Sequence, residues 1–597
     1  MAILNVLSTF TYKLSCLPSI HRSHAESSFS MCYHTTTTTR RSGNYEPPTW
    51  DYSYIQSLNT THYTAEGFVM RRDELKERVK DMLKNEEMKE VEKMEMIDEL
   101  QRLGCSYHFE EEIMAALMDI YMKKKKKSSN NYKSSEEKDL YATALEFRVL
   151  RQNGFNISQE VFDCFMDGRR SRFNVNLGQD IKGLLNLYEA SFLSKEGETT
   201  LEMAKNFSAK HLKRVAYDQN LNDPNLLALV QHALEVPLHW RVPRLEATFF
   251  INSYQGKPTS DPILLELAKL DFNIVQALHM EDLKFVARWW KKSLIPERLT
   301  FVRDRVVENF FWTVGSSFNP KYVNCRRIGA KLNCFICTID DMYDVFGTLD
   351  ELQLFTDAIE RWDDVTEIRH LPEYMRFCYL ALHNFVNEVA FDVFKEHGIS
   401  IAHYLKKSWA DLCKAYLQEA KWYDSGYTPT FEEYIENSWI SISCPLILVH
   451  GFFYVNNPVE DSAALHCLTD YHQIIRLSSM ILRLANDKGT SPYEMKRGDV
   501  PKAIQCYMGE AKVSANDARD FIDLEMNEIW KKMNKVRIEG GSPFSGTFIE
   551  AAMNIARMAQ CMYQHGDGHG INSKNFETQT HIQTLLFEPI PLINNII

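Results

Sequence analysis

Residues 332–346 read Leu-Asn-Cys-Phe-Ile-Cys-Thr-Ile-Asp-Asp-Met-Tyr-Asp-Val-Phe, so three carboxylates stand in an apolar run. The apolar residues before them predict one buried helix. Positions i and i+4 share a helix face, so Asp340 and Asp344 are expected to point the same way, with Asp341 about 100° round. Carboxylates in such surroundings need a cation, and oxygen-only ligands suit a hard divalent ion such as Mg²⁺. The alternative is a helix end whose acids face water.

A second polar cluster contains Asn486, Thr490 and Glu494. Their amide, hydroxyl and carboxylate recur at i, i+4 and i+8, so one helix face would carry three oxygen ligands for a second divalent site. Arg483 lies one turn upstream and Lys502 eight residues beyond Glu494. Metal ligands flanked by cations indicate a shared polyanion, and diphosphate is the obvious candidate.

The rest of the chain predicts an all-α protein. Among 597 residues there are only 24 glycines and 19 prolines, and segments 141–150 and 261–284 carry apolar residues at helical spacing. The length indicates two or three domains. The net charge of −12 does not favour a nucleic-acid partner. No apolar run approaches the roughly 18 to 20 residues that a membrane span needs.

Two composition changes divide the chain. Residues 1–39 contain 14 Ser or Thr and a single acid, Glu26, which is typical of an organelle transit peptide, although a plain disordered N-terminus is the alternative. A short Gly/Pro-bearing linker at residues 255–260 predicts a boundary. We therefore expect a transit peptide at 1–39, an N-terminal α-helical domain at 40–260 and a catalytic domain at 261–597.

Together the two acidic motifs resemble the metal motifs of class I terpene synthases. Three further elements fit the plant monoterpene synthase pattern: Arg303-Asp304-Arg305, Arg40-Arg41 with Trp50 after eight residues, and the run at 566–570, Gly-Asp-Gly-His-Gly. The resemblance runs from about residue 40 to the C-terminus. It implies an N-terminal α-barrel and a C-terminal class I terpenoid synthase α-bundle, with the N-terminal strand folded back across the mouth of the active site.

The resemblance also implies an activity: Mg²⁺- or Mn²⁺-dependent ionisation of geranyl diphosphate to a ten-carbon olefin or alcohol through an allylic carbocation, in the plastid stroma. Three ions, a small-molecule substrate and a monomer are expected. The implied metal ligands are Asp340, Asp341, Asp344, Asn486, Thr490 and Glu494. The implied diphosphate-binding residues are Arg303, Arg305, Arg483 and Lys502, with Arg40 and Arg41 closing the lid. Trp312, Tyr563 and Asp567 match the residues that line and cap the pocket, and a helix broken near Pro445 would expose carbonyls to the cation.

Two residues depart from the family pattern. Lys488 stands where an aliphatic residue is usual, and its ammonium would either weaken the metal site or point outward. Pro492 removes a backbone donor between Thr490 and Glu494, so the row of ligands is expected to bend. The alternatives are a sesquiterpene synthase acting on farnesyl diphosphate, a chain-elongating prenyltransferase, and a prenyl-diphosphate binder without catalysis.

Overall fold

The computed structural model describes residues 40–129, 138–218, 223–362, 367–455, 462–497, 500–569 and 576–592. The chain divides into a short unit, residues 1–40, and a compact unit, residues 41–597, to which the following description applies. The described residues form helices and no sheet, with one isolated bridge between Met166 and Phe173. The predicted all-α fold is confirmed. The predicted transit peptide lies outside the described residues.

The first half of the compact unit is built from short and medium helices, joined by single 3₁₀ turns labelled η. Their bounds are α1 (Tyr52–Ser57), α2 (Glu66–Lys84), α3 (Glu90–Arg102), η1 (Ser106–His108), α4 (Glu110–Ser129), α5 (Leu140–Gln152), η2 (Gln159–Phe165), η3 (Val175–Gln179), α6 (Ile181–Ser191), α7 (Thr199–Asp218), α8 (Pro224–Glu235), η4 (Leu238–Trp240) and α9 (Pro243–Gln255).

The second half contains longer helices that pack around a common interior. Up to the helix break they are α10 (Pro262–Ser293), α11 (Ile295–Arg298), α12 (Val306–Ser316), η5 (Pro320–Tyr322), α13 (Val323–Asp341), the π turn η6 (Met342–Phe346), α14 (Leu349–Arg361), η7 (Glu367–His370), α15 (Glu373–His397), α16 (Ala402–Ser425) and α17 (Phe431–Ser441). The remainder are α18 (Cys444–Val455), α19 (Ser462–Thr469), α20 (Gln473–Arg497), α21 (Ala503–Ala511), α22 (Ala515–Glu539), α23 (Gly546–Tyr563), α24 (Phe576–Ile582) and the π turn η8 (Gln583–Phe587).

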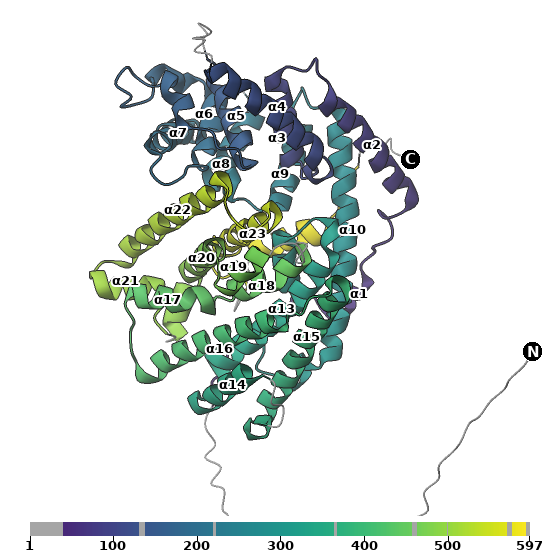
Figure 1. The fold of residues 1–597 in the computed structure, drawn as a ribbon, viewed down its shortest axis with the longest axis vertical. Coiled ribbons are helices and arrows are strands. Elements are labelled where there is room, and N and C mark those ends of the chain that lie inside the picture. Colours follow the sequence, from purple (N-terminus) through teal and green to yellow (C-terminus); the bar gives the residue numbers. More distant parts are fainter. Residues whose placement is uncertain are drawn as a thin grey trace, which may run out of the picture. The chain divides into compact units, whose positions relative to one another are not determined.

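Helix α10 joins the two halves. Asp261 caps it by accepting hydrogen bonds from the N–H groups of Ile263 and Leu264 at 2.7 and 3.3 Å, and Pro262 occupies the first turn, where its missing N–H costs nothing. In Figure 1 α10 runs beside both halves, and it packs on α2 and α9 as well as on α12 and α13. One hydrophobic core extends from Ile55 to Leu586. The expected boundary coincides with the start of α10, but the division into domains stays a prediction.

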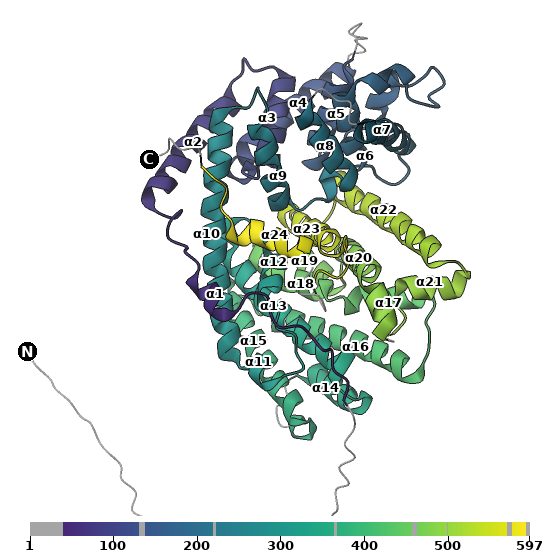
Figure 2. The ribbon, with the colours of Figure 1, turned by 180° about the vertical axis from the view of Figure 1, so that it is seen from behind.

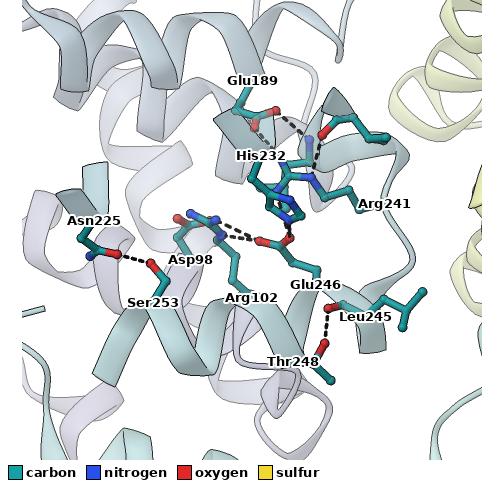
Figure 3. A network of polar contacts seen from close by, with 12 residues as sticks. Asp98, Arg102, Glu189, Asn225, His232, Arg241, Leu245, Glu246, Thr248 and Ser253 are labelled. Carbon is teal, nitrogen blue, oxygen red and sulfur yellow. Dashed lines mark hydrogen bonds and ion pairs between the residues drawn. The ribbon is translucent and has the colours of Figure 1, made fainter. Parts of the chain in front are cut away.

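A buried ion network holds the first half together (Figure 3). Glu246 of α9 accepts two hydrogen bonds from Arg102 of α3 at 3.0 and 2.9 Å, one from Arg241 at 2.8 Å, and lies 2.9 Å from His232 of α8. Burial alone would raise the pKa of Glu246, but Arg241 and Arg102 outweigh it and hold the pKa below its ordinary value. Because every oxygen of this carboxylate is paired, the network is structural.

One stretch of the described residues, Phe431–Val455, is long and apolar enough to cross a membrane by composition. It consists of α17 and α18 counted together across their break, and its uncharged residues 438–455 show that the expectation of no apolar run near this length was wrong. About 67% of its most apolar window is buried inside the protein, where α17 packs on α16 and α20, and α18 on α13. The packing of this stretch is that of core helices.

The residues before α1, 41–51, form an extended stretch, here called the N-terminal segment. Figure 2 shows it crossing the face of the second half from α1 toward α14. Trp50 packs on Phe587 with ring centroids 5.8 Å apart, and Gln579 of α24 donates to the Thr49 hydroxyl at 3.3 Å. The segment therefore folds back over the second half, with Trp50 at its anchored end, as the resemblance implied.

Candidate active site

A cavity of about 190 Å³ lies among the helices of the second half. Its walls come from α12, α13, α16, the junction of α17 and α18, α20 and α23, with contributions from the N-terminal segment and the loop after α23. Sequence-predicted residues that line it are Arg303, Trp312, Asp340, Asp344, Arg483, Asn486, Thr490, Lys502, Tyr563 and Asp567. Residues far apart in the sequence thus meet around one space.

The first acidic motif stands at the end of α13. Asp340 belongs to the last turn of that helix, and Asp344 to the π turn that continues it; both line the cavity. Asp341 is completely buried and does not line the cavity. The predicted shared face of Asp340 and Asp344 is confirmed, whereas Asp341 is turned away from them.

Asp341 is held by two residues outside the motif. Tyr45 of the N-terminal segment donates its hydroxyl to Oδ1 at 2.5 Å, and the backbone N–H of Arg303 donates to Oδ2 at 2.8 Å. Burial raises the pKa of Asp341 to about 6, against the lowering effect of Arg303. The guanidinium of Arg303 forms an ion pair with Asp340 and lies 3.5 Å from Asp341 through Nε. Arg303 therefore joins both acids.

The second motif lies on α20. Asn486 and Thr490 face the cavity, and the Thr490 hydroxyl donates to the Asn486 carbonyl at 3.0 Å. Glu494 lies on the same helix, with its side chain outside the described residues. Gly489 permits this approach, because a Cβ there would stand 2.8 Å from the Tyr563 carbonyl oxygen of α23. A larger residue would push α20 away from α23.

Both departures from the family pattern are accommodated. Lys488 points outward and its ammonium contacts both oxygens of Asp523 at 2.5 and 2.7 Å, at the partly exposed surface of α22. Helix α20 continues through Pro492 without interruption. Proline cannot donate to the Lys488 carbonyl four residues earlier, and Arg519 donates to it instead at 3.0 Å. The expected bend of the row of ligands stays a prediction, because the side chain of Glu494 lies outside the described residues.

Three cations face the same cavity, each beside an acid or amide. Arg303 pairs with Asp340, Arg483 contacts the side chain of Asn486, and Lys502 donates to Glu419 at 3.0 Å. Burial by itself would raise the pKa of Glu419, but Lys502 and Arg483 outweigh it and lower the pKa. These cations are the groups best placed to bind an anion.

Three other predicted cations do not line this cavity. Arg305 is buried and donates to the carbonyl of its neighbour Asp304 at 2.9 Å. Arg41 donates to the Asp344 carbonyl at 3.2 Å and lies over the Tyr423 ring, on an adjoining cavity. Arg40 belongs to the other unit, so its predicted role in closure stays a prediction.

An aromatic wall faces the metal motifs. The rings of Trp312 and Tyr563 lie 6.2 Å apart between centroids, and Asp567 accepts a hydrogen bond from the His569 backbone at 3.0 Å. Nε2 of His569 lies 3.0 Å from Asn309 Oδ1, and burial lowers the pKa of His569 to about 4. The imidazole is therefore neutral at ordinary pH.

The helix break predicted before Pro445 is confirmed. Helix α17 ends at Ser441 and α18 begins at Cys444, and the two residues between them, Ile442 and Ser443, line the cavity. Ser443 has a left-handed backbone (φ +66°), an unfavourable conformation for a residue with a side chain. The Ser443 carbonyl accepts from the Ile447 N–H at 3.1 Å and the Ile442 carbonyl from the Ser443 hydroxyl at 2.5 Å, so the exposure of carbonyls to the cation stays a prediction.

Several lining residues were given no role from the sequence, among them Tyr45, Asn309, Glu419 and His569. His569 lay inside the quoted Gly-Asp-Gly-His-Gly run, and Tyr45 between Arg41 and Trp50, so both had a local signal. Glu419 and Asn309 had none, because their roles depend on partners from other helices.

The donor set fits divalent ions, although the described residues contain no cluster of three or more His, Cys, Asp or Glu side chains arranged to hold one. Carboxylate oxygens of Asp340 and Asp344 occupy one wall, and the amide and hydroxyl oxygens of Asn486 and Thr490 another. Such a set leaves coordination positions of each ion open for water or for the oxygens of a bound phosphate ligand.

Comparison with known proteins agrees with this geometry. Residues 291–532 match the metal-binding domain of the terpene synthase family, and residues 49–234 match the terpene synthase N-terminal domain. A chloroplastic 1,8-cineol synthase of Nicotiana suaveolens is 55% identical over 93% of this chain and 87% of its own length. A chloroplastic limonene synthase of Coffea arabica is 53% identical, with 92% and 89% covered.

Two solved structures are similar along nearly the whole chain. A limonene synthase with 2-fluorolinalyl diphosphate superposes with a TM-score of 0.88 at 44% identity, over 92% of this chain and all of the other. An isoprene synthase of Populus x canescens, with three Mg²⁺ ions and dimethylallyl-S-thiolodiphosphate, superposes with a TM-score of 0.82 at 42% identity, over 91% and 99%. The chain belongs to the terpene synthase family, and within it is an enzyme of the monoterpene synthase type, a lyase that acts on a prenyl diphosphate.

Proposed function

We propose that this enzyme ionises geranyl diphosphate and releases a ten-carbon olefin or alcohol together with diphosphate. The observation that carries the proposal is the meeting of two oxygen-donor motifs and three cations around one cavity with an aromatic wall. A cavity of this composition offers a polar end for a diphosphate and an apolar end for a short prenyl chain. The relatives, named as cineol, limonene and myrcene synthases, support the ten-carbon substrate over farnesyl diphosphate.

The enzyme uses divalent metal ions, as its metal-binding family domain indicates. We propose three, either Mg²⁺ or Mn²⁺, in keeping with the three ions of the similar isoprene synthase. Asp340 and Asp344 would hold ions at one wall, and Asn486, Thr490 and Glu494 at the other. When bound, these ions stabilise the negative charge that grows on the departing diphosphate.

The protein's own cations would take the diphosphate oxygens. Arg303 and Arg483 present planar guanidinium groups that can donate two parallel hydrogen bonds, and Lys502 presents a point charge. Each is paired with a neighbouring side chain here, so a bound diphosphate would exchange one anionic or polar partner for another. The desolvation free energy of these buried cations is therefore offset by their present partners before the substrate binds.

The allylic cation must be stabilised and kept from water. The faces of Trp312 and Tyr563 can contribute roughly 0.5 to 2 kcal/mol each through the ring quadrupole. The neutral imidazole of His569 offers an acceptor for a proton at the end of the reaction. Closure by the N-terminal segment and by the loop carrying Asp567 would exclude water.

The enzyme is placed in the plastid, as several relatives are described as chloroplastic. We propose the stroma, with residues 1–39 as the transit peptide, and a monomer that needs no protein partner.

Incubating the purified chain with geranyl diphosphate and Mg²⁺, followed by gas chromatography–mass spectrometry, tests the function. A volatile ten-carbon product that disappears with chelator is expected. Asp340→Ala should lower turnover by about 10²- to 10³-fold, while the exposed Asp350→Ala serves as the matched control. A product from farnesyl but not geranyl diphosphate would refute the substrate, and equal loss in both variants would refute the role of Asp340.

A further inference from the structure

The second aspartate of the acidic motif is used differently from its neighbours. Asp340 and Asp344 line the cavity, whereas the Asp341 carboxylate is completely buried and engaged on both oxygens. One oxygen accepts the backbone N–H of Arg303 at 2.8 Å, and the other accepts the Tyr45 hydroxyl at 2.5 Å. Nearly 300 residues separate Tyr45 from Asp341, so this contact joins the N-terminal segment to the metal motif.

The sequence around Tyr45 is built to turn its ring inward. Asn44 adopts a left-handed backbone (φ +47°), which asparagine tolerates better than most residues. Gly43 is required because a Cβ there would stand 2.5 Å from the Tyr45 ring. The Asn44 N–H donates to the Ser42 hydroxyl at 3.2 Å and closes the turn. The Gly-Asn-Tyr sequence therefore presents the phenol to the cavity instead of to solvent.

Tyr45 also contacts the cation that the acids share. The guanidinium of Arg303 lies over the Tyr45 ring, 5.6 Å from its centroid, and forms its ion pair with Asp340 from there. The ring thus lies against Arg303 while the hydroxyl holds Asp341. Loss of the hydroxyl would free one oxygen of Asp341 in a buried site and remove the polar contact that seats the ring on Arg303.

We propose that Tyr45 is a positioning residue: its hydroxyl latches the N-terminal segment to Asp341, and this contact holds Arg303 in place beside Asp340. Asp341 then acts as the acceptor of the Tyr45 hydrogen bond and not as a third metal ligand. The other attachments of the segment, Arg41 to the Asp344 carbonyl and Trp50 to Phe587, secure its two ends. Tyr45 is the contact in between that reaches a buried acid of the motif.

The expected effect on catalysis rests on the proposed function, whereas the Tyr45–Asp341 contact can be tested without it. The variant is Tyr45→Phe, which keeps the ring and removes the hydroxyl. The matched control is Tyr52→Phe, an exposed tyrosine of α1. Amide hydrogen exchange in residues 41–51 is measured on the metal-free protein. The values of kcat, KM and the Mg²⁺ activation constant are measured with geranyl diphosphate as substrate.

Tyr45→Phe should speed exchange across residues 41–51, raise the Mg²⁺ activation constant and lower kcat by about 10- to 100-fold, because Arg303, which Tyr45 holds in place, is the outer-shell partner of Asp340. KM should change less, because the lost contact orients Arg303 and does not touch substrate. Tyr52→Phe should match the wild type. A Tyr45→Phe protein that equals the control in both exchange and kcat would overturn the proposal.

The variant Asp341→Asn tests whether Asp341 serves to hold Tyr45 or serves as a metal ligand. In a latch, Tyr45→Phe and Asp341→Asn act on one contact, so the double variant should be no worse than the poorer single variant. Fold losses that multiply would show that Asp341 acts independently of Tyr45 and would overturn the assignment. If the wild type were inactive with geranyl diphosphate, the proposed function would fail, and hydrogen exchange alone would decide the latch.

Discussion

Replacing Arg519 by methionine should weaken the second metal motif without altering any residue that lines the cavity. Pro492 stands inside α20 and has no N–H for the Lys488 carbonyl. Nη1 of Arg519, from α22, donates to that carbonyl at 3.0 Å, and Nη2 donates to the Ser491 hydroxyl at 3.0 Å. Ser491 is completely buried. Arg519 therefore replaces the hydrogen bond that Pro492 cannot donate, and α20 continues beyond the proline.

The magnitude follows from these two contacts. Each hydrogen bond from a charged donor is worth about 1.5 to 3 kcal/mol when buried, and Arg519 is partly exposed, so about 2 to 4 kcal/mol should be lost in total. With a specific unfolding entropy of roughly 2.1 cal/mol/K per residue, this lowers the unfolding midpoint of a 597-residue chain by about 2 to 3 °C. Displacement of Asn486 and Thr490 should also raise the Mg²⁺ activation constant by about 10-fold.

Pro492→Ala is the decisive companion variant. Alanine restores an N–H that can donate to the Lys488 carbonyl within α20, so Arg519→Met should cost less in that background. A coupling of about 1 kcal/mol or more between the two substitutions is expected, because both act on the same carbonyl. Differential scanning calorimetry and Mg²⁺ titration of activity measure it. Equal losses from Arg519→Met with proline or alanine at 492 would refute the reasoning.

Further outcomes are expected elsewhere. Glu419→Gln removes the anionic partner of the buried Lys502 ammonium and should cost about 3 kcal/mol. Added Mg²⁺ and diphosphate should reduce the difference in thermal stability between this variant and the wild type, and an unchanged difference would count against Lys502 as a diphosphate ligand. Lys488→Leu removes an exposed ion pair and should change stability by less than about 0.5 kcal/mol and leave the Mg²⁺ activation constant unchanged, as kinetics would show. Burial lowers the pKa of His239 to about 3 and of His450 to about 4, below the ordinary value of about 6.5. The folded state then binds fewer protons than the unfolded state, so stability is lost as pH falls below about 6.5. The loss should reach roughly 2 kcal/mol for each histidine at pH 5. Thermal unfolding between pH 8 and pH 5 measures this loss, and an unfolding midpoint that does not change with pH would contradict it.

The all-α fold and much of the site were predictable because they depend on short separations along the chain. Apolar periodicity predicted the helix before Asp340, and the i, i+4 rule placed Asp340 with Asp344 on one cavity wall. The family resemblance, together with Pro445, predicted the break between α17 and α18. In each case the relevant geometry is settled within one or two helical turns.

Only the tertiary structure decided which predicted ligands face the cavity and what supports them. Asp341 turns away because Tyr45 and Arg303 hold its carboxylate, and α20 continues through Pro492 because Arg519 reaches its free carbonyl. These partners come from other elements, and no spacing rule connects residues that meet only after the helices pack. The sequence by itself determined the helices, the motifs and the family; packing decided the partner of each buried charge, because that depends on which surfaces come together in three dimensions.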